Sequence, residues 1–194
     1  YYYDYEDKQL RTKIFLPPPS PFRTLEALDN IPKSRIRGLE LEAGLYPVDG
    51  LSIKAAAAYT DGEIQSYTGV NVAGIVANFD GVDMPFAPEW EFSASADYEW
   101  QVGNVLAFFG GTVNYHDEMT TIIGGERPLD TTGYTTSGTM PFITDNYTLV
   151  DLRAGIETEG GLRLTVFGKN VFDEYYSNNG FSTFETITRF AGMP

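Results

Sequence analysis

Polar and apolar side chains alternate strictly along several stretches of the sequence, and this alternation constrains the fold more than any other feature. In the segment 88–100 the odd positions carry only Glu, Ser and Asp, while the even positions carry Trp90, Phe92, Ala94, Ala96, Tyr98 and Trp100. Successive side chains of a β-strand point to opposite faces, so a period of two indicates a strand with one apolar and one polar face. The sequence therefore predicts an all-β protein.

The same pattern recurs along the chain, and no long helical periodicity competes with it. Apolar faces are expected at 39–45, 51–59, 105–115, 150–156 and 162–166, and an opening strand near 1–13 brings the total to about seven strands. Several of these segments alternate for about twice the 5–6 residues of a usual soluble strand.

The predicted connections are of two kinds that alternate along the chain. Tight turns are expected at 47–50, 101–104 and 159–161, and polar loops of roughly 20 residues at about 14–33, 66–88 and 121–145, with a fourth starting at Ser177. In an up-and-down antiparallel sheet, alternate connections lie at opposite ends. One end then carries only tight turns and the other only long loops, which is the asymmetry of a transmembrane β-barrel of the outer membrane.

The spacing of Trp90 and Trp100 fits the two edges of a membrane. At about 3.3 Å per residue they are separated by roughly 33 Å along the strand, and a tilt of about 40° reduces this to roughly 25 Å along a barrel axis, the height of the apolar band between the aromatic girdles. A Lys or Arg side chain at the bilayer midplane costs about 2–4 kcal/mol. The charged face must therefore line a wet lumen, and the apolar face must meet lipid.

Composition excludes several other classes of protein. The chain has no cysteine, which rules out disulfides, thiolate metal sites and a cysteine nucleophile. A formal net charge of -14 argues against nucleic-acid binding. The single histidine, His116, adjoins Asp117 and Glu118 and is read as a solvated rim residue. Since no nucleophile elbow or phosphate-binding loop is present, we expect no enzymatic activity, no cofactor and no metal site.

Four segments carry a resemblance to a known family. They are "YYYDYEDKQ" at 1–9, "IPKSRIRGLELEAGLYPVDGLSIKAAAAYTDGEI" at 31–64, "APEWEFSASADYEW" at 87–100 and "NYTLVDLRAGIETEGGLRLTVFGKNVFDEYY" at 146–176. The last is the most specific, with Asp-Leu-Arg at 151–153, a glycine turn, and Asn-Val-Phe-Asp followed by two tyrosines. These segments resemble the carboxy-terminal part of TonB-dependent receptors.

The resemblance implies a barrel of about 22 strands with an amino-terminal plug inside it. Residues 1–194 would then be an antiparallel up-and-down segment of that barrel, without the plug and without the last strand. It further implies location in the bacterial cell outer membrane and contact with outer-membrane lipid. Coupling to the TonB energy-transducing complex, through the missing amino-terminal part, would drive active uptake of a scarce, bulky small-molecule ligand. An iron–siderophore complex is an example of such a metal chelate.

Two groups of residues are candidates for functional roles. Lumen-facing charges would line the route of a solute, although they could equally hold one another across strands or contact the plug; these are Glu40, Glu42, Asp151 and Arg153. Aromatic residues with polar tips suit the membrane interfaces; these are Trp90, Trp100, Tyr175 and Tyr176. Adjacent positions point to opposite faces, so only one of the two tyrosines can meet lipid. Loop aromatics could catch substrate; these are Tyr67, Phe79, Phe86, Tyr134, Phe142, Phe181 and Phe184.

Two alternatives remain open from the sequence. The first is a secreted β-sandwich that binds carbohydrate and uses the aromatic loops as its platform. The second is a small, complete outer-membrane barrel of about eight strands that acts as an adhesin or structural protein.

Overall fold

The computed structural model describes residues 1–19, 24–72, 74–127, 142–182 and 187–192. Seven strands build a wall, in agreement with the predicted number. They are β1 (Tyr2–Phe15), β2 (Thr24–Leu45), β3 (Leu51–Ser66), β7 (Trp90–Val102), β8 (Val105–His116), β11 (Tyr147–Thr158) and β12 (Arg163–Gly168). Among the described residues, no helix is long and apolar enough to cross a membrane.

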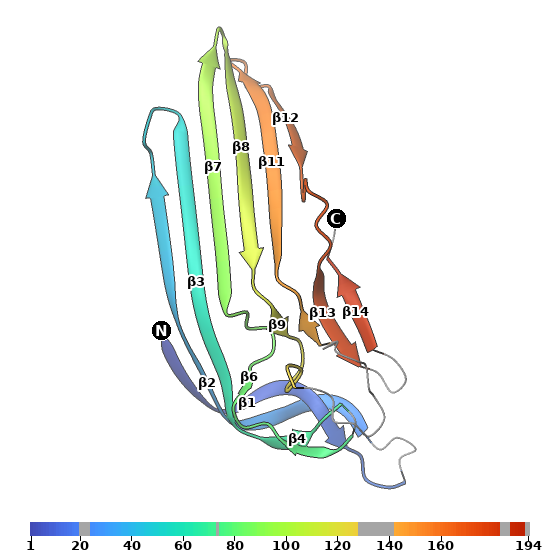
Figure 1. Cartoon of the computed structure of the whole chain (residues 1–194). Coiled ribbons are helices and arrows are strands. Elements are labelled where there is room, and N and C mark those ends of the chain that lie inside the picture. The colour runs from blue at the N-terminus through green and yellow to red at the C-terminus, as the bar shows by residue number, and fades with distance from the viewer. Residues whose placement is uncertain (20–23, 73, 128–141, 183–186, 193–194) are drawn as a thin grey trace.

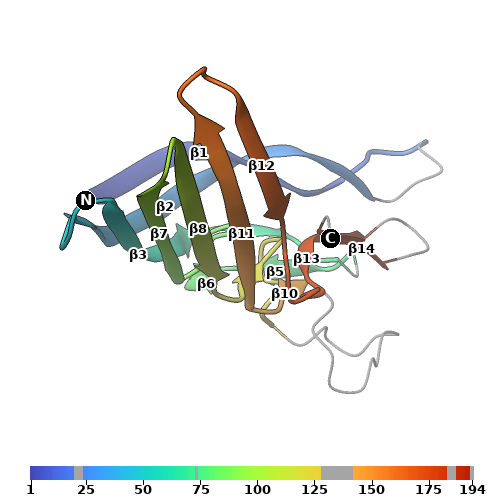
Figure 2. The same cartoon turned by 90° about the horizontal axis from the view of Figure 1, so that it is seen from above.

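The wall strands lie in a single antiparallel sheet whose spatial order is β12-β11-β8-β7-β3-β2-β1. Each wall strand therefore pairs with the wall strand that precedes or follows it along the chain. Seen from above, the sheet is curved rather than flat (Figure 2). This arrangement confirms the predicted up-and-down topology and contradicts the β-sandwich alternative, because no second sheet covers the apolar face of the wall in the part of the chain that the structure describes.

The two ends of the wall differ in their connections, as predicted. Short turns at 46–50, 103–104 and 159–162 lie at the upper end in Figure 1, while the described parts of the connections that follow β1, β3 and β8 lie at the lower end. Gly50, Gly103 and Gly161 supply positive φ angles of 80°, 59° and 80° in the three turns. Tight hairpin turns need such angles, and glycine adopts them without steric cost. We call the two ends the turn end and the loop end.

The first long connection is much shorter than predicted. β1 continues to Phe15 and β2 already begins at Thr24, with Ile14 paired to Leu25, so the predicted loop at 14–33 is wrong in extent. Charged residues stand close together in this part of the hairpin, which obscures the alternation. The pairing of the two backbones, rather than side-chain pattern, defines the strands there.

The other long connections contain short strands. Residues 66–88 include β4 (Thr68–Val70), β5 (Val76–Asn78) and β6 (Val82–Asp83), which pair with β1, β4 and β3 respectively. Further along, β9 (Met119–Thr120) pairs with β10 (Ile143–Thr144). Residues 128–141 of the predicted third loop lie outside the described residues. These pairings bring segments from several connections together at the loop end.

The carboxy-terminal segment also differs from the prediction. β12 ends at Gly168 because Asn170 adopts a left-handed φ of 45°, and its side chain bonds both the N–H and the C=O of Glu174 at 2.9 Å. The predicted strand through Tyr175 and Tyr176 is therefore interrupted by a turn. The segment predicted to begin a loop at Ser177 instead forms β13 (Ser177–Ser182), which pairs with β14 (Ile187–Ala191).

The main buried core lies at the loop end rather than within the wall. Its members come from β2, from β3 and from the connections that follow β3 and β8: Ile31, Ile64, Tyr67, Phe79, Val82 and Ile123. The partly buried Leu10 and Ala77 pack against it. The Tyr67 hydroxyl donates to Asp29 at 3.1 Å, and burial raises the pKa of Tyr67. The long connections are thus packed around a core of their own.

Candidate functional site

One face of the wall is apolar and exposed along its whole height. Large exposed side chains on this face come from β2, β7, β8, β11 and β12: Leu39, Leu41, Leu45, Trp90, Phe92, Tyr98, Trp100, Phe109, Val113, Leu152, Ile156, Leu164 and Val166. Leu41 is 61% exposed and Val166 71%. Soluble monomers rarely expose a continuous apolar surface of this extent, so this face requires an apolar environment.

Aromatic side chains gather at both edges of the apolar face. Toward the loop end, Trp90 packs against Tyr59 at 4.8 Å and against Phe92 at 5.6 Å between ring centroids. Toward the turn end, Tyr98 stacks on Trp100 at 5.3 Å. β7 therefore carries a tryptophan near each of its ends, with aromatic neighbours at both.

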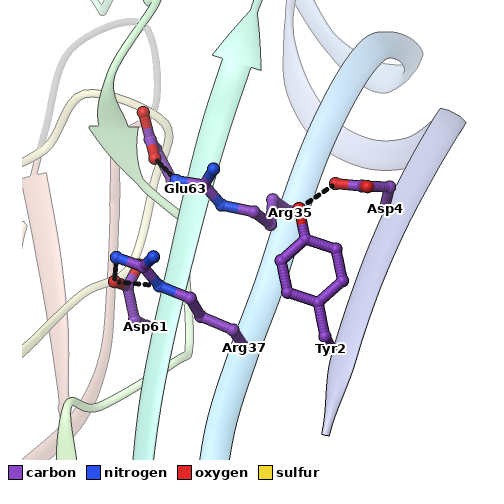
Figure 3. A network of polar contacts seen from close by, with 6 residues as sticks. All are labelled: Tyr2, Asp4, Arg35, Arg37, Asp61 and Glu63. Carbon is purple, nitrogen blue, oxygen red and sulfur yellow. Dashed lines mark hydrogen bonds and ion pairs between the residues drawn. The ribbon is translucent and has the colours of Figure 1, made fainter.

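Beyond the loop-end aromatics, the side chains on the same face change from apolar to charged. The change takes place between one cross-strand pair and the next pair on that face, two residues further along each strand. Leu39 pairs in register with Tyr59, and the next pair on that face is Arg37 with Asp61. The Arg37 guanidinium donates to Asp61 at 2.7 and 2.9 Å, and Arg35 contacts Glu63 at 2.5 Å one step further on. Figure 3 shows these ion pairs side by side on β2 and β3, with Tyr2 and Asp4 of β1 beside them.

On the opposite, polar face, Arg153 is held by Asp97. Its guanidinium donates to both carboxylate oxygens of Asp97, at 2.5 and 2.6 Å, so the pair links β11 to β7 across β8. Gly110 of β8 lies beneath the pair, and a Cβ there would stand 2.0 Å from an Asp97 oxygen. Asp151, a second predicted residue, accepts a hydrogen bond from the backbone N–H of Asn170 at 2.9 Å. Both residues therefore make structural contacts between elements.

Glu40 and Glu42 form no ion pair among the described residues, and both are exposed on the polar face. Glu42 lies beside Lys54 at an open hollow of about 570 Å³, whose floor consists of small residues such as Ala56 and Ser95. The structure thus divides the four predicted residues into two that are engaged and two that remain accessible.

Tyr175 and Tyr176 have different environments. Tyr176 stacks on Tyr147 at 4.3 Å, and Tyr147 stacks on His116 at 5.0 Å. His116 Nδ1 lies 2.8 Å from the Glu91 carboxylate, and the histidine side chain is still 38% exposed, so this residue adds contacts with Glu91 and Tyr147 to its partly solvated position. Tyr175 is 81% exposed.

Phe108 is a residue that the sequence pattern did not single out. It belongs to the polar parity of β8, yet it is only 5% exposed. Its ring lies over Gly155, and the Arg163 guanidinium lies over the ring at 4.2 Å from the centroid. The sequence does contain a signal that could have identified Phe108: an aromatic residue stands at a polar position of its strand, opposite a glycine on the neighbouring strand.

The loop aromatics fall into two groups. Tyr67, Phe79 and Phe142 are at most 4% exposed, so the prediction that they catch substrate at the surface is wrong. They pack inside the loop end, where the connections need a core. Phe86 and Phe181 line a cavity and remain accessible in part. Tyr134 and Phe184 lie outside the described residues.

The loop end also contains an acidic cavity of about 440 Å³. Burial raises the pKa of Glu126, and burial together with Asp61 and Glu63 raises the pKa of Asp83. Further carboxylates in its lining are Glu89, Asp117 and Glu118. In the part of the chain that the structure describes, no three His, Cys, Asp or Glu residues are arranged to hold a metal ion.

Comparisons with known proteins agree with this geometry. Residues 1–171 match the family described as TonB dependent receptor-like, beta-barrel. The ferric yersiniabactin uptake receptor FyuA from Yersinia pestis shares the fold with a TM-score of 0.66 at 17% identity, covering 86% of this chain and 23% of that protein. No curated protein matches the sequence.

Two receptors from Acinetobacter baumannii share the fold as well. The ferric preacinetobactin receptor BauA has a TM-score of 0.57 at 16% identity, covering 94% of this chain and 24% of that protein. The siderophore receptor PiuA has a TM-score of 0.56 at 17% identity, covering 86% and 21%. The chain thus spans about a quarter of the length of these receptors. At such identities the likeness concerns the fold alone.

Proposed function

The chain belongs to the TonB-dependent receptor β-barrel family, and on that premise we propose that the protein containing it imports a scarce, bulky solute, such as an iron–siderophore complex. Proteins of this family are transporters of the outer membrane and carry out no enzymatic reaction. The segment described here would supply part of the barrel wall and several of the connections at its loop end.

The observation that carries the import proposal is the division of the wall into two faces. An exposed apolar face bounded by aromatic residues suits contact with lipid. A polar face suits a hydrated passage because charged side chains there stay in water. Glu40 and Glu42 are exposed on this face and form no ion pair with a described residue, and Glu42 shares an open hollow with Lys54. Together the two faces are what a conduit through a membrane requires.

The class of solute rests on the structural relatives. The three receptors named above are described as receptors for ferric yersiniabactin, for ferric preacinetobactin and for a siderophore. Their resemblance in fold supports an iron chelate as the cargo of the present protein. Energy would reach the barrel from the inner membrane through the TonB complex and an amino-terminal plug.

Uptake measurements in cells test the proposal. Cells that express the full-length protein, cells that lack its gene and cells that lack TonB receive a panel of iron-55-labelled siderophores. At least one complex should accumulate only when both the protein and TonB are present. Accumulation of every complex regardless of the protein would contradict the proposed import function.

Glu40 and Glu42 are our candidates for the solute route. Substituting both by glutamine should lower the initial uptake rate several-fold, while the amount of receptor in the membrane stays unchanged. Glu159→Gln is a matched control, since Glu159 lies exposed at the turn end, away from the polar face. Equal uptake by the double variant and the control would exclude the two glutamates from the route.

A further inference from the structure

A small cavity at the loop end has the features of a binding site of its own. It has a volume of about 230 Å³ and is enclosed by β1, the β4 region, the segment that follows β9, and β13. These elements are far apart in sequence and meet only in the folded chain. Most of its lining is apolar, with Val70, Ile122 and Phe181 among the contributors. Cavities that bind small molecules combine an apolar lining with a few polar groups in this way.

Lys13 supplies a positive charge to this cavity. Its ammonium group donates one hydrogen bond, to the carbonyl of Val72 at 3.1 Å, and forms no ion pair with a described carboxylate. Burial lowers the pKa of Lys13. The nearby charge of Glu26 raises this pKa, but by less than burial lowers it. An ammonium group has three donors, so Lys13 retains capacity for a charged acceptor.

Arg11 lies next to this lysine but is already engaged. Its guanidinium is paired with Glu26, the residue opposite Lys13 on β2, and lies over the ring of Phe181 at 5.7 Å from the centroid. Glu26 is thereby held by Arg11 and does not form an ion pair with Lys13. The Lys13 ammonium therefore leaves a positive charge at the cavity that is not balanced by a described carboxylate.

Phe86 brings a second aromatic ring to the lining. Its backbone adopts a φ of 60°, which is unusual for a residue with a side chain, and its N–H donates to Thr120 at 2.9 Å. The side chain is 54% exposed although it lines the cavity. Strained backbone conformations of this kind occur preferentially where a side chain must be held for a ligand.

We propose that this cavity binds a small organic anion whose carboxylate group is attached to an apolar ring. The carboxylate accepts hydrogen bonds from the Lys13 ammonium, and the ring lies against Phe86, Ile122 and Phe181. The cavity differs from the polar face assigned to the solute route, so the site does not depend on the proposed import function.

Three probes separate the contributions of charge and ring. Benzoate carries both, benzamide carries the ring without the charge, and acetate carries the charge without the ring. Binding to the purified full-length protein in detergent is measured by saturation-transfer NMR, with protein-free micelles as the blank. Benzoate should bind most tightly, because charge-assisted hydrogen bonds are roughly twice as strong as neutral ones. Equal binding of benzoate and benzamide, or no binding of benzoate, would overturn the proposal.

Variants then locate the site. Lys13→Gln should raise the dissociation constant for benzoate about tenfold and leave that for benzamide unchanged. Lys13→Arg should restore most of the affinity. The matched control is Lys8→Gln, since Lys8 is a partly buried lysine of the same strand that contacts Met84 and does not line the cavity. An equal loss in the control variant would contradict the assignment to Lys13.

Circular dichroism and thermal unfolding verify that each variant is folded. Ile122→Trp fills the cavity without touching the charge, and it should abolish benzoate binding as well. Siderophore uptake is measured separately on the same variants. Normal uptake by variants that have lost benzoate binding would show that the cavity and the solute route are separate. If the unaltered protein imports a siderophore but does not bind benzoate, the cavity proposal alone has failed; if it binds benzoate but imports none of the complexes, the import proposal alone has failed.

Discussion

Gly38 illustrates how single residues shape the polar face of the wall. The Tyr1 side chain crosses over it and reaches Thr60 on β3, where the two hydroxyl groups lie 2.8 Å apart. The Asp97–Arg153 pair crosses Gly110 in the same manner. In both places a long side chain connects strands that are not neighbours. It can do so because the strand between them has a glycine, which carries no side chain, at the crossing point. Such links hold the wall together where neither face packs against a core.

Gly38→Ala should destabilise the barrel by about 1–3 kcal/mol, the usual cost of overpacking. A Cβ at this position would lie 2.1 Å from the Tyr59 carbonyl oxygen and 2.5 Å from the Tyr1 hydroxyl. Gly44→Ala is the matched control on the same strand, because no atom lies within 4 Å of its added Cβ. Denaturant unfolding of the purified full-length protein measures the difference. Equal stability of the two variants would show that the crossing side chains contribute nothing.

At the scale of elements, the register of β2 and β3 sets an edge of the apolar face. The ladder places Leu39 opposite Tyr59 and Arg37 opposite Asp61, so a single step separates hydrocarbon-compatible pairs from ion pairs. A register shift of one residue would move every one of these side chains to the other face. The strong preference of each face for its own environment therefore fixes the pairing.

Neighbouring substitutions on β7 distinguish the two faces. Ser93 and Ala94 are both exposed and adjacent, but Ala94 lies on the apolar face between Ala55 and Val113. Ala94→Arg should destabilise the membrane-embedded barrel by about 2–4 kcal/mol and lower its yield in the outer membrane. Ser93→Arg should cost about 1 kcal/mol or less, through loss of its hydrogen bond to Asn114. In water the two variants would behave alike, so equal yields would argue against lipid on the Ala94 face.

The segment that contains Glu126 should depend on pH. Burial raises the pKa of Glu126 above its ordinary value of 4.5, so the packed state binds a proton more readily than the opened state. Protonation of Glu126 therefore stabilises the packed state of this segment. That contribution is fully present below the ordinary pKa and is lost as the pH rises through the raised pKa. Amide hydrogen exchange of residues 119–127 should therefore show less protection at pH 8 than at pH 5. Glu126→Gln should remove this pH dependence; a slope unchanged in the variant would assign it to another group.

The alternation of side chains was sufficient to predict the wall strands but not the structure of the loop end, and the reason is physical. Wall strands such as β7 separate an apolar from a polar environment, and the alternation records that separation directly. The β1–β2 hairpin extends beyond the wall, and residues such as Arg11 and Lys13 follow its backbone pairing without a comparable division. The turn at Asn170 depends on a side chain bonding its own backbone, which leaves no periodic signal.

The candidate residues show the same limit. Alternation assigned Glu40, Glu42, Asp151 and Arg153 to one face, and the registers from β2 to β11 place them on the same face of the sheet. Their role in a solute route stays a prediction. Their partners depend on which residues stand opposite one another. The pairing of Arg153 with Asp97 across β8 needed a register, and so did the stacking of Phe108 over Gly155. These contacts join strands whose alignment no single strand specifies.

At the scale of the whole molecule, the two ends of the wall face different tasks. The turn end closes hairpins with the fewest residues, whereas the loop end gathers several connections (Figure 1). These connections share a core and enclose two cavities. In bacterial outer-membrane barrels the short turns are periplasmic and the long loops extracellular. The loop end would then meet solutes outside the cell, and the packing of its connections would hold the binding surfaces in place.

Cysteine labelling in intact cells tests this orientation, and residues 1–194 contain no native cysteine that would compete with an introduced one. Val48 at the turn end and Val76 at the loop end are a matched pair, 58% and 59% exposed. A membrane-impermeant maleimide should label the Val76→Cys variant in intact cells and the Val48→Cys variant only after the outer membrane is permeabilised. The two sites offer the reagent similar access within the folded chain, so a difference reports the position of the membrane. Labelling of Val48→Cys alone in intact cells would reverse the orientation, and equal labelling of both would place neither end behind a barrier.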